Sequence, residues 1–168
     1  MPNKYSSLKK RQSGVVLPIS MIMLLLLTLI SVTGSQVAGL EEKMAGNSRD
    51  SNLAFQAAEA ALRGGETFLT QATLPAFTAT GTNGLYSEAG TPPQQSDDWS
   101  SFNTVTYSEA SLGHTASAPL YVIQQLKAIG SGSLDAGNYN ENELYRITAR
   151  GVGGTSDAVV VLQSVYKR

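Results

Sequence analysis

The chain has 168 residues, of which 42% are hydrophobic and 15% charged, and it contains no cysteine. That length allows one modest domain with an appendage and excludes a multidomain enzyme. The formal net charge of -1 combines a basic tip, with four of the 12 Lys and Arg residues before Gln12, and an acidic remainder. Beyond those first residues there is no basic patch for nucleic acid to bind, because phosphate contacts need grouped Lys and Arg.

The N-terminal part of the chain contains a long segment without charge, from Gln12 to Leu40. Its apolar run over residues 15–32, together with the uncharged continuation, supplies the about 20 residues that a helix needs to cross a bilayer. The basic residues before it should stay in the cytoplasm, which places everything after it outside. We therefore expect a membrane-spanning segment rather than a buried core helix.

The helical pattern continues beyond the apolar run. Apolar residues recur mostly at three- and four-residue spacing as far as Leu62, and Glu59 and Arg63 form an i,i+4 pair in the favourable order. One helix is predicted from about Val15 to about Thr70.

Two places weaken this predicted helix. In the polar stretch 46–52, Gly46 has low helix propensity and Asp50 or Ser51 could cap a new helix, so a bend or local melting is the alternative there. Residues 64–65 are both glycine and weaken the helix again near its end.

Four residues are candidates for packing against other helices: Gly34, Ala38, Leu40 and Met44. Gly34 and Ala38 belong to a set of small residues that also includes Ser35, Gly39 and Ala45. Small side chains favour close helix packing in lipid, because backbone approach and dispersion replace the hydrophobic drive there. Chance enrichment is the alternative, since Gly and Ala are also common in single-span anchors.

From about Ala72 to Ala118 the composition shifts to Thr, Gly, Ser, Pro and Gln, which is typical of irregular loop. A short strand is predicted at residues 102–107. Tyr86 and Trp99 are expected to cover the small core of the C-terminal globular part of the chain, which we call the head, rather than to act as surface aromatics for adhesion.

The C-terminal part is patterned as strands over residues 120–126, 144–150 and 158–166, with residues 151–157 as a hairpin connection. These elements predict an antiparallel sheet packed on the C-terminal half of the helix, so the fold class is α+β. The loop 135–143 gathers oxygen donors, but their spacing does not match a calcium-binding EF-hand loop, and a polar turn is expected.

No catalytic constellation is found in the sequence. The only histidine, His114, lies in a Gly-, Ala- and Ser-rich stretch without a second His to share a metal, and there is no Gly-rich phosphate loop after a strand. We expect a structural subunit that is not an enzyme and that needs no metal or cofactor.

Residues 9–14, ending in Gly14 and followed by Val15, resemble a class III leader of the type IV prepilin kind. The resemblance implies that prepilin peptidase cuts after Gly14 and methylates the new N-terminus at Val15. An ordinary secretory signal peptide fits less well, because its mature sequence begins afresh whereas this helical pattern continues. A permanent signal anchor is the other alternative.

Residues 40–47 and 54–63 are similar to the N-terminal domain of PilX-type minor pilins, and residues 145–151 and 159–164 are similar to the closing strands of that family. The resemblance implies a structural subunit of a Gram-negative type IV pilus that acts in assembly initiation, twitching motility and adhesion. Its implied partners are prepilin peptidase, other minor pilins, the major pilin and the inner-membrane assembly platform. It would reside in the inner membrane, with a cytoplasmic N-terminus and a periplasmic head, and in the assembled pilus.

The expected domain organisation follows from these segments. Residues 1–14 are the leader, 15–40 the transmembrane half of the helix, 41–72 its extracytoplasmic half, and 73–168 the globular head.

One position departs from the family pattern. Most type IV pilins have Glu as the fifth mature residue, where it is thought to pair with the N-terminal ammonium of a neighbour, and here that residue is Ile19. A carboxylate in hydrocarbon is costly unless it is paired, which fits a role in assembly register. Its absence favours a place at or near the pilus tip, and simple tolerance of an apolar residue is the alternative. A minor pseudopilin of type II secretion, or a membrane-anchored adhesion domain outside any filament, also remain open.

Overall fold

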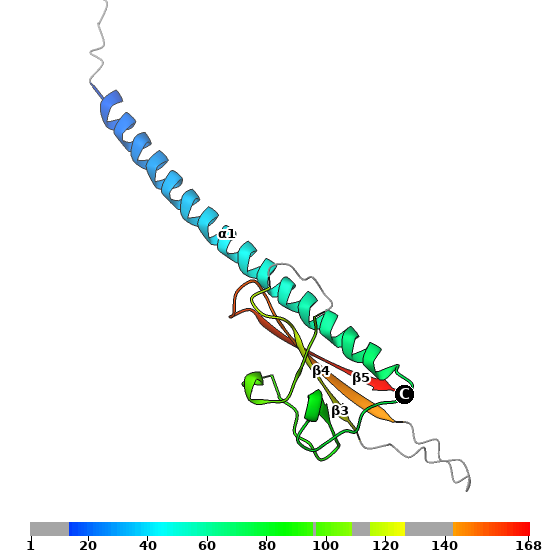
Figure 1. Ribbon diagram of the computed structural model, residues 1–168. Helices are drawn as coiled ribbons and strands as arrows, with labels where there is room; N and C mark the ends of the chain where they lie inside the picture. Colours follow the sequence, from blue (N-terminus) through cyan, green and yellow to red (C-terminus); the bar gives the residue numbers. More distant parts are fainter. Residues whose placement is uncertain (1–13, 96, 109–114, 127–142) are drawn as a thin grey trace, which may run out of the picture. The chain divides into compact units, whose positions relative to one another are not determined.

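The structure is a computed structural model that describes residues 14–95, 97–108, 115–126 and 143–168 (Figure 1). The chain divides into two compact units, Met1–Ala45 and Gly46–Arg168. His114 and residues 135–142 of the polar loop lie outside the described residues. The elements follow in the order α1 (Val16–Leu69), η1 (Thr82–Gly84), β1 (Leu85–Tyr86), η2 (Trp99–Ser101), β2 (Val105–Thr106), β3 (Leu120–Gln125), β4 (Leu144–Val152) and β5 (Val159–Lys167).

Helix α1 matches the predicted helix to within one residue at each end. It is uninterrupted through residues 46–52, so the alternative of local melting is wrong. The predicted pair of Arg63 and Glu59 is formed as an ion pair on the exposed side of the helix. The stretch 46–52 is exposed except for the half-buried Asp50, and the buried face of the helix begins at Ala54, so the packing that supplies most helix stability in proteins starts directly after it.

Within the second unit, α1 packs on the sheet through a face of small residues. Ala54, Ala57, Ala58 and Ala61 are all fully buried. Gly151 of β4 lies against this face so closely that a Cβ atom there would collide with the backbone of Ala54 and Ala58. Helix and strand therefore approach closely because neither carries a large side chain at the crossing.

The paired glycines near the end of α1 also lie at close contacts. A Cβ on Gly64 would come within 2.6 Å of the Tyr107 ring, and one on Gly65 within 2.8 Å of Ile147 Cγ2. Both positions stay helical, although glycine lowers helix propensity. The glycines leave room for the side chains of β4 and of the segment after β2.

The sheet has five strands in the order β1-β3-β4-β5, with β2 also pairing β3. Strands β3, β4 and β5 are antiparallel neighbours, as predicted, and β4 and β5 form the expected hairpin. Strand β1 pairs with β3 in parallel, with Leu85 opposite Ile123, so the sheet is mixed rather than purely antiparallel. The strand predicted over residues 102–107 is only two residues long.

The head's core lies between the helix and the sheet, around Leu69, Ile123 and Ile147, which are fully buried. Tyr86 and Trp99 are 2% and 3% exposed, so the prediction that they cover the core is confirmed. Trp99 Nε1 donates to the carbonyl of Gln94 at 3.0 Å. Every buried side-chain nitrogen and oxygen among the described residues has a hydrogen-bond partner.

Candidate functional site

The predicted cleavage point lies immediately before α1. Gly14 is exposed, and no atom lies within 4 Å of the position that a Cβ would take there. Val15 precedes the first helical residue, and its carbonyl accepts a hydrogen bond from the Ile19 N–H at 3.2 Å. The Gly14–Val15 peptide bond is therefore accessible in this structure.

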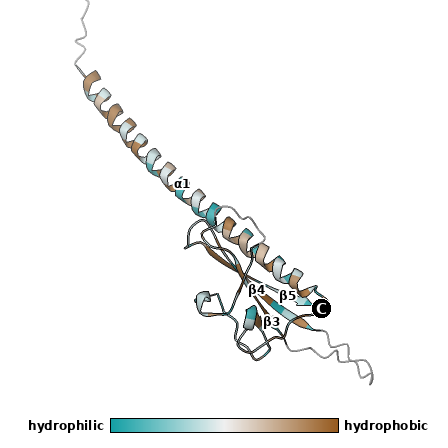
Figure 2. Cartoon of the chain, viewed as in Figure 1, coloured by the Kyte–Doolittle hydropathy of each residue, from teal (hydrophilic) through white to brown (hydrophobic). Residues whose placement is uncertain are grey.

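The first unit presents the apolar segment as an exposed helical surface, coloured brown over much of the N-terminal half of α1 in Figure 2. By length and composition α1 is able to cross a membrane, and its most apolar window has no buried residue. The side chain of Ile19 is 53% exposed, so an apolar group stands on the helix surface at the fifth position after Gly14.

The predicted helix-packing residues lie on this exposed part of α1. Gly34, Ala38, Leu40 and Met44 are all exposed, and a Cβ at Gly34 would meet no atom within 4 Å. No described part of the chain therefore covers any of the four. Their role in packing against other helices stays a prediction.

Four hydroxyl groups in or directly after the apolar run of residues 15–32 are bonded within the helix, and sequence reasoning did not single them out. The hydroxyls of Ser20, Thr28, Ser31 and Thr33 each donate to a helix carbonyl three or four residues earlier, at 2.8–3.0 Å. Because no water is available in hydrocarbon, polar groups there must be satisfied within the protein. These hydroxyls are compatible with a lipid or helix-packed surrounding. The sequence feature that could have identified them is the presence of Ser and Thr in or next to an otherwise apolar run.

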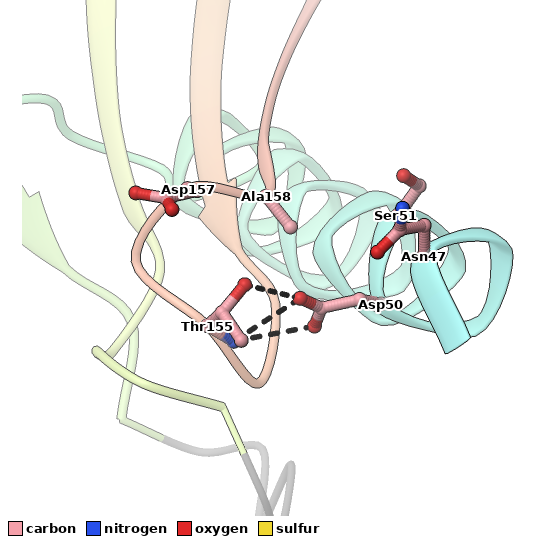
Figure 3. Close-up of a pocket in the computed structure, with 6 residues that line it drawn as sticks. All are labelled: Asn47, Asp50, Ser51, Thr155, Asp157 and Ala158. Atoms are coloured by element: carbon pink, nitrogen blue, oxygen red, sulfur yellow. Dashed lines mark hydrogen bonds between the residues drawn. The ribbon is translucent and has the colours of Figure 1, made fainter. Parts of the chain in front are cut away.

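In the second unit, Asp50 joins α1 to the turn between β4 and β5 (Figure 3). Its carboxylate accepts hydrogen bonds from the N–H of Gly154, from the N–H of Thr155 at 3.2 and 3.3 Å, and from the Thr155 hydroxyl. We call this set of contacts the Asp50 clamp. The sequence suggested Asp50 as a helix cap, and the structure shows a long-range acceptor instead.

The environment of the clamp favours the charged carboxylate. The Thr155 hydroxyl is the main cause that lowers the pKa of Asp50. Desolvation is the next-largest effect and opposes it, and the N–H groups of Gly154 and Thr155 lower the pKa further. Gly153 is required next to the clamp, because a Cβ there would collide with Asp50. The glycine-rich turn predicted over residues 151–157 thus brings two backbone donors to one helix carboxylate.

A cavity of about 280 Å³ adjoins the clamp. It is lined by Asn47, Asp50, Ser51, Thr155, Asp157 and Ala158. The Asp50 carboxylate is already hydrogen-bonded to the turn, and the Asp157 side chain points away from Asp50 in Figure 3. The described residues contain no group of three or more His, Cys, Asp or Glu that could hold a metal ion. The clamp therefore fixes the hairpin to the helix and offers no evident ligand set.

An exposed apolar N-terminal helix segment, followed by an α+β head in which the rest of the helix packs on a small sheet, defines a pilin-like protein. Two family models match the chain: PilX N-terminal over residues 13–63, and Type IV pilus assembly protein PilX C-term over residues 71–168. The chain belongs to the PilX family of type IV pilus assembly proteins. No curated protein and no solved structure gives a significant match to the chain.

Family membership sets the coarse function. A PilX-type protein is a type IV pilus assembly protein, and its family is structural rather than catalytic and interacts with other pilus components. The N-terminal apolar helix suits membrane anchoring of such a pilus-associated protein.

Proposed function

We propose that this chain is a minor pilin that primes assembly of a type IV pilus together with other minor pilins. Residues 1–14 serve as the leader, 15–40 as the transmembrane half of the helix, 41–72 as its extracytoplasmic half and 73–168 as the head. The precursor spans the inner membrane with its N-terminus in the cytoplasm and its head in the periplasm. The mature subunit then enters the pilus and supports twitching motility and adhesion.

Processing begins at the accessible bond before α1. Prepilin peptidase cuts after Gly14 and methylates Val15, and the mature subunit then joins the major pilin and other minor pilins on the inner-membrane assembly platform. In that bundle, Gly34, Ala38, Leu40 and Met44 contact neighbouring helices. Their exposure on α1 and the absence of covering residues at Gly34 support this assignment.

The main support for placing this subunit at the pilus tip is the apolar side chain of Ile19, which is exposed on the surface of α1. A subunit without a carboxylate at this position cannot neutralise the N-terminal ammonium of a neighbour within the low-dielectric helix bundle. Such a subunit fits best at or near the tip, where no neighbour requires that pairing.

Mass spectrometry of the chain isolated from sheared pili tests the processing. A mature chain that starts at methylated Val15 is the expected result. A chain that starts at Met1 and is found only in membranes would contradict the proposal. The PilX match favours a pilus over a type II secretion pseudopilus, and absence of the chain from pili together with a secretion defect would favour the pseudopilus.

The substitutions Ile19→Glu and Ile19→Gln test the tip placement as a matched pair, because both add polarity and only the first adds a carboxylate. Immunogold labelling of pili should show the unmodified chain at filament ends. The Glu variant should spread along the filament or reduce the number of pili, and the Gln variant should not spread. Unchanged piliation and unchanged labelling in the Glu variant would remove the argument from Ile19.

A further inference from the structure

Another cavity of the head has a volume of about 520 Å³ and is lined in part by Arg150 of β4. Leu120 of β3 is the cross-strand partner of Arg150 and also lines the cavity. The neighbours of Arg150 in β4, Ala149 and Gly151, belong to the face that packs on the helix. Successive side chains of a strand alternate, so the cavity lies on the face of the sheet opposite α1. Small-molecule sites have volumes of about 300–1,000 Å³, and this cavity is therefore large enough for a ligand.

The turn over residues 97–100 forms a second wall of the cavity and is anchored by Trp99. The Trp99 ring is buried, and its Nε1 donates to the Gln94 carbonyl at 3.0 Å. Gln124 of β3 donates through Nε2 to the Gly90 carbonyl, also at 3.0 Å, and ties the segment before the turn to the sheet. The side chains of the turn are therefore presented on a backbone that is fixed relative to β3 and β4.

Three charged side chains line the cavity, Asp97, Asp98 and the half-buried Arg150. The Arg150 guanidinium forms no hydrogen bond or ion pair with any residue that the structure describes. The pKa of Asp98 is lowered mainly by the Ser100 hydroxyl and N–H, against desolvation, and the charge of Arg150 adds a smaller decrease. Arg150 and Asp98 are thus close enough for their charges to interact, but they share the cavity without a direct contact.

Each of the two carboxylates keeps one oxygen available. Asp98 Oδ1 accepts hydrogen bonds from the N–H and the hydroxyl of Ser100, at 3.0 and 2.8 Å. Asp97 Oδ2 accepts from the Gln94 N–H at 2.6 Å. Asp98 Oδ2 and Asp97 Oδ1 have no hydrogen-bond partner within the described part of the chain. The cavity therefore combines an unpaired cation with two available carboxylate oxygens, and two hydroxyl side chains of its lining can donate or accept: Thr106 and Ser117.

We propose that this cavity binds a zwitterionic small molecule of the free amino acid or short peptide class. The Arg150 guanidinium binds the carboxylate of the ligand, because its planar fork of donors matches the two carboxylate oxygens. Asp97 and Asp98 accept hydrogen bonds from the ammonium group of the ligand through their available oxygens. Ala118 and Leu120, two apolar residues of the lining, contact its carbon atoms. This inference goes beyond the proposed function and does not depend on processing or on entry into pili.

The mixture of charges in the lining selects a ligand that carries both signs. An anion alone would pair with Arg150 but would be repelled by two carboxylates in the same cavity. A cation alone would pair with the carboxylates but would be repelled by the guanidinium. A zwitterion places an opposite charge next to each group, which is the electrostatic complementarity that gives binding sites their specificity.

Isothermal titration calorimetry on the unmodified full chain in detergent micelles tests the proposal, with the dipeptide L-alanyl-L-alanine as the probe. Two matched probes each lack one charge: the N-acetyl form lacks the ammonium, and the C-terminal amide lacks the carboxylate. We expect saturable binding of the dipeptide and at least about tenfold weaker binding of each blocked form, because each loses charge-assisted hydrogen bonds. Equal affinities for the three probes, or no binding of the dipeptide at millimolar concentration, would overturn the proposal.

The substitutions Arg150→Gln and Arg146→Gln locate the site as a matched pair. Both remove a guanidinium from the same face of β4, and only Arg150 lines the cavity. Arg150→Gln should weaken binding of the dipeptide at least about tenfold and remove the preference for the dipeptide over its amide, and Arg146→Gln should do neither. Trp99 fluorescence confirms that the head of each variant is folded. A preference for the dipeptide that persists in Arg150→Gln, or that is lost equally in both variants, would overturn the proposal.

Discussion

The close crossing between α1 and β4 makes Gly151→Ala the most informative single substitution in the head. The added Cβ would collide with the backbone of Ala54 and Ala58 and would lie 3.0 Å from Ala57 Cβ. None of these atoms belongs to a side chain that can rotate away. Overpacking of a core costs about 1–3 kcal/mol, and the rigid surroundings place this case at the upper end, about 3 kcal/mol.

Two glycines of α1, Gly65 and Gly46, allow the effect of Gly151→Ala to be compared with matched glycine-to-alanine substitutions. Gly65→Ala gains about 1 kcal/mol of helix propensity, but its Cβ would lie 2.8 Å from the Cγ2 methyl of Ile147, so we expect a net loss of about 1 kcal/mol. Gly46→Ala meets no atom within 4 Å and should stabilise the helix by about 1 kcal/mol. From the most to the least stable, the expected order is therefore Gly46→Ala, the unmodified chain, Gly65→Ala and Gly151→Ala.

Unfolding of the head can be followed on the full chain in detergent micelles. Trp99 is the only tryptophan and is 3% exposed, so its fluorescence reports loss of the head's core. Urea titrations of the four proteins give the free energies of unfolding. If Gly151→Ala is as stable as the unmodified chain, the strand does not approach the helix as closely as described, and the reasoning from the alanine face is wrong.

Two further predictions concern pH and use the same fluorescence assay. The pKa of Asp50 is lowered, so the clamp's contribution is present above the ordinary value of 3.8 and is lost as the pH falls below it. Asp50→Asn should therefore destabilise the head at neutral pH and flatten this acid dependence, and an unchanged acid profile would contradict the clamp. Burial and the hydrogen bond to Glu143 raise the pKa of Tyr145 from 10.0 to about 12, so the head should lose stability as the pH rises through that interval. Tyr145→Phe keeps the ring beside Phe77 and should remove this part of the alkaline loss, and an identical loss in both proteins would contradict it.

Local sequence patterns were sufficient for the larger elements. The apolar run and the three- and four-residue spacing predicted α1 to within a residue at each end, an alternating pattern predicted β4 and a β-branched run predicted β5. These signals are repeated over many residues, so single exceptions such as Gly46 do not hide them. The candidate cleavage bond was placed in another way, by the resemblance of residues 9–14 to a type IV prepilin leader.

Contacts between distant residues were not predictable from one sequence. Asp50 and Gly154 are 104 positions apart, and nothing in the residues around Asp50 distinguishes a long-range acceptor from a helix cap. The parallel pairing of β1 was missed for a different reason, because two residues are too few to show an alternating pattern. The weak helix propensity of Gly64 and Gly65 was identified from the sequence. The reason why glycine occupies these positions, the close approach of the Tyr107 and Ile147 side chains, is visible only in the fold.

The change in composition along α1 explains how one helix serves two surroundings. Over residues 15–32 most of its exposed side chains are large and apolar, and the hydroxyls of Thr28 and Ser31 are satisfied within the helix itself. After Gly46 the buried face consists mainly of alanine, and the contacts are made with β4 and its turn. A large side chain in the second part would push the sheet away, and a charge in the first part would oppose burial in lipid or in a helix bundle. Substitutions in the two parts should therefore fail in different ways, the first in insertion or assembly and the second in folding of the head.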